Sequence, residues 1–456
     1  MYIIFTIAAL VTSFFINIYT TFTFWECLSM SLFVFYMLYF LDNFGKRFVI
    51  LEVIILMAIF ICLVMPIMGY HYFNATNRLA RTWTFHMRIP SNQFYSYMFP
   101  ATIAMILGMK LPVFYRSKIF QNHEQYLINA KKYVSTMKYQ GVILVMIGVF
   151  ATVISKVVPS ALATVTYLLR FTMFVGMFYC LYSNFAYKRL VLTLVFGLLA
   201  YQAVSAGMFG ELVFMSLICL IQVMLGRKFS FSLKVSLAAV GLFLLIVLQA
   251  VKPAFRMQTW KGNNKESKVE VFADLFQQKL SNPSTLFSNE KALFAFYGRF
   301  NEGQIISRVM YNVPQRFPYA NGETIFLSLV ASVVPRILWP DKPEAGGAAN
   351  FMRFVGIKLK GYSIGLSPFG EAYGNFGAVG GISFMFAFGL LFNFIFHWML
   401  KTALKVPSLI LWFPFVFFYA VQIESDVVTM INSLSKFALL AYLYYRFFPP
   451  IFKLKL

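Results

Sequence analysis

Charged residues are scarce in this sequence, and acidic residues are the scarcest. Only 12% of its 456 residues are Asp, Glu, Lys or Arg, whereas 60% are hydrophobic. Because soluble domains have about a quarter of their residues charged, a chain of ordinary soluble domains is excluded. Apolar stretches of about 20 residues recur from Met1 onward, and this length crosses a hydrocarbon core of about 30 Å. The sequence therefore predicts an all-α polytopic membrane protein that begins with a span rather than with a removable signal peptide.

Residues that bind metals are also few. The four cysteines and four histidines are Cys27, Cys62, Cys180, Cys219, His71, His86, His123 and His397. They are widely scattered, and no two of them have the spacing of metal ligands. The cysteines all lie in apolar segments, where a free cysteine is usually a buried core residue. We therefore expect buried thiols, no metal site and no cofactor.

The balance of charge is strongly basic, with 39 Lys and Arg against 16 Asp and Glu. We expect no nucleic-acid partner, because most of these cations lie in short loops between apolar segments and there set membrane orientation. The pattern predicts about twelve spans, at 2–19, 22–41, 48–69, 94–113, 139–157, 160–182, 190–206, 209–226, 235–250, 376–399, 408–423 and 431–448. With this count the basic loops all fall on one side. The positive-inside rule makes that side cytoplasmic, together with both termini.

One long polar segment, residues 251–372, interrupts the apolar pattern. The chain thus divides into spans one to nine (1–250), an extracytoplasmic segment (251–375) and spans ten to twelve (376–456). Loops 70–93 and 424–430 are expected on the same side as the segment.

Residues 251–372 contain fifteen basic and nine acidic residues, an excess of six positive charges where the positive-inside rule predicts few. An anionic ligand at the outer leaflet would account for this excess. Within the segment, 323–339 is apolar but short and is interrupted by Pro335 and Arg336. We predict a re-entrant or interfacial helix there.

Four arginines are the candidate ligands for such an anion: Arg299, Arg308, Arg336 and Arg353. A guanidinium stays charged at physiological pH and matches phosphate oxygens in bidentate geometry. The alternative is that these side chains extend to lipid headgroups or pair with nearby carboxylates. Lys342 lies in the same segment and is a further candidate. Arg170 falls inside a predicted span, where an unpaired charge is costly, so we expect it to face the interior of the bundle.

Three carboxyls are candidates for a catalytic base: Glu302, Asp341 and Glu371. A sugar hydroxyl that attacks an anomeric carbon benefits from a carboxylate that accepts its proton. Glu371 could instead cap the following helix, and Asp341 could simply shape a turn. Trp339 and Tyr373 could stack on sugar rings, although aromatic belts at membrane interfaces are the commoner explanation.

Two motifs in this segment carry a resemblance to a known family. PRILWPDKP at 335–343 is followed by SPFGEAYGNFGAVGG at 367–381. Together with many spans and one large late loop, they resemble the bacterial oligosaccharide repeat-unit polymerases of O-antigen and capsule synthesis. The resemblance implies a GT-C-like, metal-independent glycosyltransferase in the bacterial cytoplasmic membrane. Its arginines would hold a pyrophosphate, which assigns Arg336 this role here, with Arg299 and Arg308 beside it. Glu371 matches the glutamate of the family's Gly-Glu segment.

The partners implied are a donor and an acceptor oligosaccharide linked to undecaprenyl pyrophosphate, the membrane lipid, and a chain-length-regulating co-polymerase. Two alternatives stay open. A ligase would transfer the finished glycan to another acceptor, and nothing in the sequence separates it from a polymerase. A flippase or exporter of lipid-linked oligosaccharides would have a charged cavity spread over many spans, and would not need a large exported loop.

Overall fold

The structure is a computed structural model that describes residues 2–112, 123–135, 137–155, 157–159, 162–260, 267–334, 339, 347–359 and 364–451. Its regular elements are all helices within these residues. Eight helices or helical runs in the described part of the chain are long and apolar enough to cross a membrane, and a ninth is added if the bent pair α7 and α8 is one span. The prediction of an all-α polytopic membrane protein is therefore confirmed.

The eight are α1 (Tyr2–Tyr19), α2 (Phe24–Asn43), the run of α3 (Ile50–Ile59), η1 (Phe60–Val64) and α4 (Met65–His71), the run of α9 (Ala163–Arg170) and α10 (Thr172–Tyr182), α11 (Lys188–Ala206), α13 (Phe231–Trp260), α20 (Ser367–Ala403) and α23 (Val427–Ile451). The other predicted spans coincide with α6 (Ser91–Lys110), α8 (Lys138–Ile154), α12 (Gly210–Met224) and the short helices η4 (Pro407–Trp412), α21 (Phe413–Val416) and α22 (Phe418–Val421). Each of the twelve predicted spans thus has a helical counterpart, and the number that cross the membrane stays a prediction.

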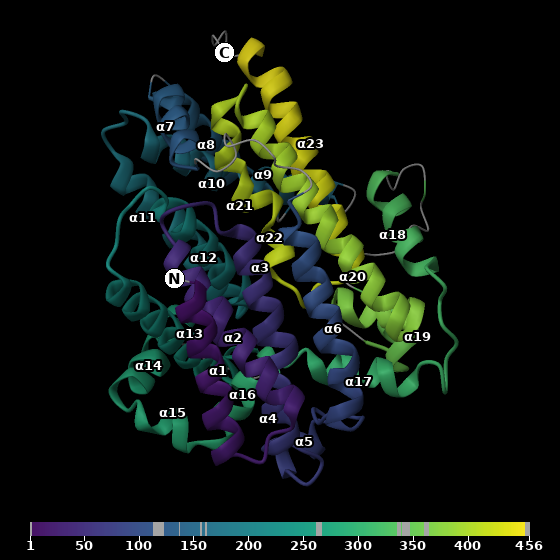
Figure 1. Ribbon diagram of the computed structural model, residues 1–456. Helices are drawn as coiled ribbons and strands as arrows, with labels where there is room; N and C mark the ends of the chain where they lie inside the picture. Colours follow the sequence, from purple (N-terminus) through teal and green to yellow (C-terminus); the bar gives the residue numbers. More distant parts are fainter. Residues whose placement is uncertain are drawn as a thin grey trace.

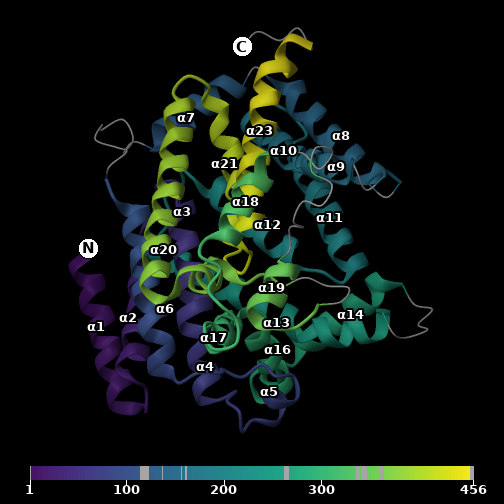
Figure 2. The same ribbon diagram turned by 90° about the vertical axis from the view of Figure 1, so that its right-hand side faces the viewer.

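The remaining helices are short and more polar. They are α5 (Arg78–Thr82), α7 (His123–Val134), α14 (Lys268–Ser281), α15 (Ser284–Ser288), α16 (Glu290–Phe300), α17 (Gly303–Asn312), α18 (Glu323–Val333) and α19 (Ala348–Val355). Figure 1 shows α5, α14, α15 and α16 at the lower end of the long helices and α7 at the upper end. Figure 2, a view from the side, has the same separation.

Loops that were predicted to share a side of the membrane contact one another. At the upper end, the backbone N–H of Gly226 donates to the carbonyl of Gly45 at 2.8 Å, and Nζ of Lys234 donates to the carbonyl of Asp42 at 3.1 Å. At the lower end, the hydroxyl of Tyr297 donates to the carbonyl of Phe85 at 2.7 Å. Helix α16 of the long polar segment and loop 70–93 therefore pack together, and we call this part of the molecule the polar layer.

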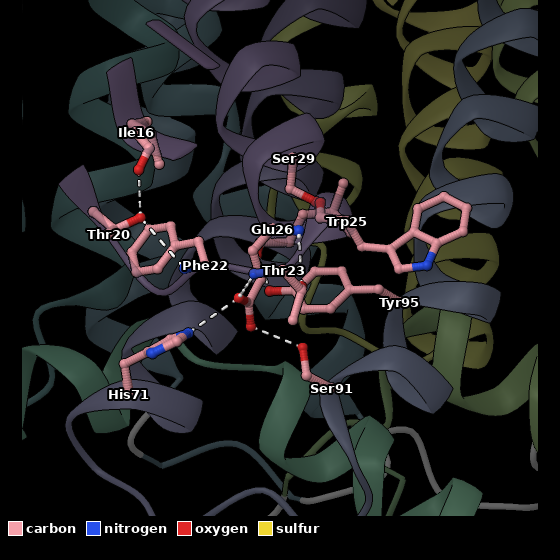
Figure 3. Close-up of polar contacts among 11 residues, drawn as sticks. Ile16, Thr20, Phe22, Thr23, Trp25, Glu26, Ser29, His71, Ser91 and Tyr95 are labelled. Carbon is pink, nitrogen blue, oxygen red and sulfur yellow. Dashed lines mark hydrogen bonds and ion pairs between the residues drawn. The ribbon is translucent and has the colours of Figure 1, made fainter. Parts of the chain in front are cut away.

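The first hairpin is fastened to this layer by Glu26, which is completely buried (Figure 3). Its carboxylate accepts from the backbone N–H of Thr23 at 2.8 Å and so forms half of a capping box at the start of α2. The same carboxylate lies 3.0 Å from Nε2 of His71 and accepts from the hydroxyl of Ser91 at 2.7 Å. The start of α2, the end of α4 and the start of α6, which were all predicted on the outer side, thus converge on one carboxylate.

Close helix packing holds the centre of the bundle. Gly108 of α6 faces Gly389 of α20, and a Cβ at either glycine would collide with the backbone of the other helix. Small residues permit such close approach between membrane helices. α20 also changes direction at Gly377, whose φ of 68° is readily adopted only by glycine. The first turns of α20, which carry Glu371, therefore form a separate short helix ahead of the predicted span.

Three predicted boundaries differ from the structure. The span predicted at 235–250 continues as helix to Trp260, so residues 251–260 belong to α13 rather than to the loop. α20 begins at Ser367, nine residues before the predicted start of its span. The apolar helix predicted at 323–339 is α18, which ends at Val333 and packs against α23. In α13 and α20, helical hydrogen bonding continues through polar turns, which a hydropathy pattern does not register.

Candidate functional site

Five charged residues gather where the polar layer meets the long helices, and we call them the charged cluster: Lys252, Arg256, Arg299, Glu302 and Glu424. Lys252 and Arg256 are four residues apart on α13, so they share one helix face. The charges of Arg256, Arg299 and Glu424 all act on Lys252. The cluster therefore joins residues from sequence positions more than 170 apart.

Arg299 is placed by the local structure of α16. The side chain of Asn289 accepts from the backbone N–H groups of Lys291 and Ala292 and so starts the helix, and Arg299 follows in its last turn, where a cation complements the helix dipole. Its Nη2 donates to Oε1 of Glu424 at 2.5 Å. The carboxylate of Glu424 raises the pKa of Arg299. This contact joins loop 424–430 to the long polar segment, on whose side of the membrane the loop was predicted.

Glu302 is the carboxyl of the cluster with an unsatisfied oxygen. Its exposed fraction is 7%, and its Oε1 has no hydrogen-bond partner among the described residues. Burial, and secondarily the charge of Glu424, holds the pKa of Glu302 well above its usual range, although Arg299 opposes this. A buried carboxyl with a raised pKa beside cations has the properties of a general base or acid. Of Glu302 and Glu371, the two predicted carboxyls that the structure describes, Glu302 is the one with an unpartnered oxygen.

The charge of the cluster is positive overall. Three cations face two carboxyls, so the basic groups outnumber the acidic ones. A second ion pair joins Arg170 of α9 to Glu211 of α12, and Gly210, the residue before Glu211, lies near Nη2 of Arg299. Arg170 thus has the interior position expected from the sequence, with a partner that the sequence did not identify. The chemistry available here is the binding of an anion next to a proton acceptor.

Glu371 is completely buried, but its oxygens are occupied. Nδ2 of Asn350 donates to Oε1 at 3.1 Å, and the backbone N–H of Val427 donates to Oε2 at 3.0 Å. Glu371 therefore caps the start of α23 and ties it to α19, rather than capping its own helix. This arrangement favours a structural role for Glu371, and its catalytic role stays a prediction.

Arg353 and Tyr373 do not join the charged cluster. Arg353 forms an ion pair with Glu323 at 2.8 Å, which is the local pairing that the sequence left open. The ring of Tyr373 packs edge-on against Tyr97 with centroids 5.0 Å apart, so it belongs to the core rather than to a sugar-binding surface. Trp339 is half-buried.

Arg308 also lies apart from the charged cluster. It is buried on α17, and the charge of Arg88 in loop 70–93 acts on it. The predicted residues Arg336, Asp341 and Lys342 lie outside the described residues.

Sequence reasoning missed Lys252 and Arg256 as site residues, although it counted them among the cations of the long loop. The missed signal is their spacing of four residues directly after an apolar span, which continues the helix and puts both on one face. Two contacts hold Arg256 there. Its Nε donates to the carbonyl of Gly207 at 2.9 Å. Its guanidinium carbon lies 4.5 Å from the centroid of the Trp260 ring, in a cation–π contact.

Metal-binding groups are not evident among the described residues, where no three His, Cys, Asp or Glu side chains are arranged to hold an ion. Cys27, Cys62, Cys180 and Cys219 are buried and free, as the sequence predicted.

Comparison with known proteins gives a family for almost the whole chain. A family described as Domain of unknown function (DUF8712) matches residues 5–399. The chain belongs to this family. No curated protein and no solved structure matches the chain. The matched region of this DUF8712 member contains α1 to α19 and most of α20, and so it includes every residue of the charged cluster except Glu424.

Proposed function

We propose that the chain is a metal-independent membrane glycosyltransferase of GT-C-like architecture. It would polymerise oligosaccharide repeat units linked to undecaprenyl pyrophosphate into a surface polysaccharide, at the outer face of the bacterial cytoplasmic membrane. One observation carries the proposal: the buried carboxyl of Glu302 has an unpartnered oxygen and lies beside an excess of cations.

The reaction requires two kinds of group, and the charged cluster supplies both. The acceptor sugar hydroxyl attacks the anomeric carbon of the donor, and its proton passes to the carboxylate of Glu302. A new glycosidic bond forms as the bond between the anomeric carbon and the pyrophosphate oxygen breaks, and the electron pair leaves with the pyrophosphate. Lys252, Arg256 and Arg299 stabilise the negative charge that develops there.

The topology that the proposal needs has twelve spans, with both termini in the cytoplasm and the charged cluster outside. Two observations support it. Loops with many cations contact one another at one end of the bundle, and the elements around Glu26, Tyr297 and Glu424 gather at the other. This arrangement follows the positive-inside rule if the first end is cytoplasmic.

The direct test supplies purified protein in lipid vesicles with lipid-linked repeat units and separates the products by size. The proposal predicts a ladder of glycans that grow by whole repeat units and stay attached to the lipid. Products that never exceed one unit, in vesicles where the protein is folded, would contradict it. Transfer of the glycan to an added non-lipid acceptor without a ladder would point to a ligase instead.

A lipid-linked oligosaccharide flippase or exporter is the second candidate, and one observation favours it. The charged cluster and the Arg170–Glu211 pair draw on α9, α12, α13 and α16, so charge is spread over several helices, as a transport path would require. Fluorescent lipid-linked oligosaccharide that crosses the bilayer, with no change in glycan length, would support this candidate against the polymerase.

A further inference from the structure

Glu302, the residue before α17, lies where two other elements pack against the start of that helix. A Cβ on Gly303 would lie 2.4 Å from Cγ of Pro66, so the start of α17 packs directly on the run of η1 and α4. A Cβ on Gly370 would lie 3.5 Å from Cγ1 of Ile306, so the first turn of α20 packs on α17 as well. Both elements therefore reach the part of α17 that carries Glu302.

Each of these two elements brings one small polar side chain toward Glu302. Cys62 precedes Pro66 by about one turn, and Ser367 precedes Gly370 by about one turn, so each lies on the face that packs on α17. Both side chains are completely buried. The charge of Glu302 and the hydroxyl of Ser367 both act on the thiol of Cys62. A buried hydroxyl and a buried thiol thus lie beside the buried carboxyl.

Ser367 and Glu302 each have an atom that lacks a partner. Within the described residues, Oγ of Ser367 has no hydrogen-bond partner, and neither has Oε1 of Glu302. A hydroxyl donates one hydrogen bond, and an ionised carboxylate only accepts. Burying both groups unpaired costs free energy that a hydrogen bond between them would recover. The two groups are complementary, and contacts of this kind at catalytic sites are often long before the substrate binds.

The backbone at both small residues departs from regular helix. Ser367 has a φ of 58°, in the left-handed region that favours glycine. The other two described non-glycine residues with positive φ, Thr84 and Asn321, are exposed, whereas Ser367 is buried. Cys62 lies at the centre of η1, which is a turn of π-helix. Strained residues and π-helical turns occur frequently at functional sites, so the backbone favours a role for this pair beyond packing.

We infer that Ser367 is a positioning residue for Glu302, whose ionised Oε1 accepts a hydrogen bond from Oγ of Ser367 and is thereby held for proton transfer. The inference rests on the proposed function only in giving Glu302 the role of base. A hydrogen bond to the charged form of a carboxyl favours that form, so Ser367 opposes the burial that raises the pKa of Glu302. The other charged groups that act on Glu302 are Glu424, which also raises its pKa, and Arg299, which lowers it.

The first test measures melting temperature against pH in detergent for the native chain, Ser367→Ala and Ser433→Ala. Ser433 is the matched control, because its hydroxyl is also buried and unpartnered within the described residues but belongs to α23. The hydroxyl of Ser367 matters most where Glu302 is ionised. The melting temperature of Ser367→Ala should therefore fall further below that of the native chain as pH rises.

A Glu302→Gln background shows whether this pH dependence belongs to Glu302. There, the difference made by Ser367→Ala should stay constant with pH, because the amide does not titrate. A difference that is constant with pH in the native background too would overturn the inference. The same pH dependence in Ser433→Ala would also overturn it.

The second test follows the rate of ladder formation against pH, whose acid limb reports ionisation of the base. Loss of a hydrogen bond to a charged group corresponds to about one pH unit or more. In both Ser367→Ala and Ser367→Gly the acid limb should move to higher pH by about that amount, and the rate on this limb should fall about tenfold. An acid limb that stays in place in both variants would overturn the inference.

The two variants of Ser367 also separate positioning from a structural role. Ser367→Gly should melt at a higher temperature than Ser367→Ala, because glycine adopts a φ of 58° without strain. Rates that follow the melting temperature, rather than the shared loss of the hydroxyl, would show that the role is structural. If Ser367→Ala does not fold, Ser367→Gly decides.

Cys62→Ala identifies the donor. A thiol is a weaker donor than a hydroxyl, so this variant should leave the acid limb near its native position. A limb that moves in Cys62→Ala but not in Ser367→Ala would make the thiol the donor and the inference about Ser367 wrong. If the native chain forms no ladder at any pH, the polymerase proposal fails, and the melting series still decides whether Ser367 acts on Glu302.

Discussion

Glu302 and Glu371 are both buried carboxyls, and their hydrogen-bond partners give them different roles. Both oxygens of Glu371 accept hydrogen bonds from the protein, whereas Oε1 of Glu302 accepts none among the described residues. A carboxylate whose two oxygens each accept from a fixed protein donor is a poorer proton acceptor for a substrate than one with an unpaired oxygen. Under the proposed function, this contrast favours Glu302 as the base and a structural role for Glu371.

The raised pKa of Glu302 predicts a pH-dependent stability. Between the ordinary carboxyl value of about 4.3 and its raised value in the folded protein, the folded state binds more protons than the unfolded state. The contribution of Glu302 to the free energy of unfolding is therefore greatest at low pH and falls as pH rises through this window. Melting curves of the native chain and Glu302→Gln in detergent, from pH 4 upward, should show the difference between them shift in favour of the variant.

The matched control for this pH series is Asp274→Asn, because Asp274 is an exposed acid of the same polar segment. Its difference from the native chain should stay small across the series. A difference between native chain and Glu302→Gln that is constant with pH would mean that Glu302 has an ordinary pKa.

Glu371→Ala should lower the free energy of unfolding by about 1–3 kcal/mol, because the buried N–H of Val427 loses its acceptor. Asn350→Ala removes only the other contact of this carboxylate and should cost less. Chemical denaturation in detergent measures both. A Glu371→Ala variant that is as stable as the native chain but makes no product would reverse the roles assigned to Glu371 and Glu302.

At this scale the sequence identified the right residue types but not their partners. Arg170 was correctly predicted to face the interior, yet its partner Glu211 is 41 residues away and could not be recognised from spacing. The same holds for Arg299 with Glu424. Partners of this kind are set by how helices pack, and a single sequence does not encode that packing in any local pattern.

Helix pairs in this bundle depend on a few glycines at points of contact. A Cβ on Gly108 would lie 2.8 Å from the backbone nitrogen of Leu390, a neighbour that cannot move without shifting α20. Gly108→Ala should therefore destabilise the protein by about 1–3 kcal/mol. Gly197→Ala and Gly241→Ala are matched controls, since nothing lies within 4 Å of the added Cβ. They should be neutral or slightly stabilising because alanine favours helix.

Thermal melting of the three glycine variants in detergent compares them directly. Equal melting temperatures would show that α6 and α20 are not in close contact.

Element boundaries were predicted well where hydropathy changes sharply and poorly where it does not. Gly377 marks the start of the predicted span at 376–399, and the structure breaks α20 there. The polar turns of α13 beyond residue 250 were predicted as loop, because Lys252 and Arg256 lower hydropathy without ending the helix. The charged cluster was incomplete in the sequence prediction for this reason.

The whole molecule has cation-rich loops at one end and the charged cluster at the other. If the cation-rich end is cytoplasmic, a cysteine at exposed Lys291 should react with a membrane-impermeant thiol reagent in intact cells, and a cysteine at exposed Arg189 should not. Both should react after permeabilisation. The four native cysteines are buried, so the unmodified chain should show little labelling. Labelling of Arg189→Cys alone in intact cells would invert the orientation.

The sequence predicted the architecture better than the site, and the reason is physical. The hydrocarbon core of the bilayer requires each span to be apolar and about 20 residues long, so composition and length are enough to find the spans. A site depends on distant residues that packing brings together, such as Glu424 against Arg299 and Arg88 against Arg308. Three predicted site residues, Arg336, Asp341 and Lys342, lie outside the described residues and stay predictions.

The most direct test of the central claim compares the native chain, Glu302→Gln and Asp274→Asn in the vesicle assay with lipid-linked repeat units. If Glu302 is the base, Glu302→Gln should form the glycan ladder about 100-fold to 10,000-fold more slowly, while still binding the lipid substrate. Asp274→Asn should match the native chain. A ladder formed at the native rate by folded Glu302→Gln would contradict the account.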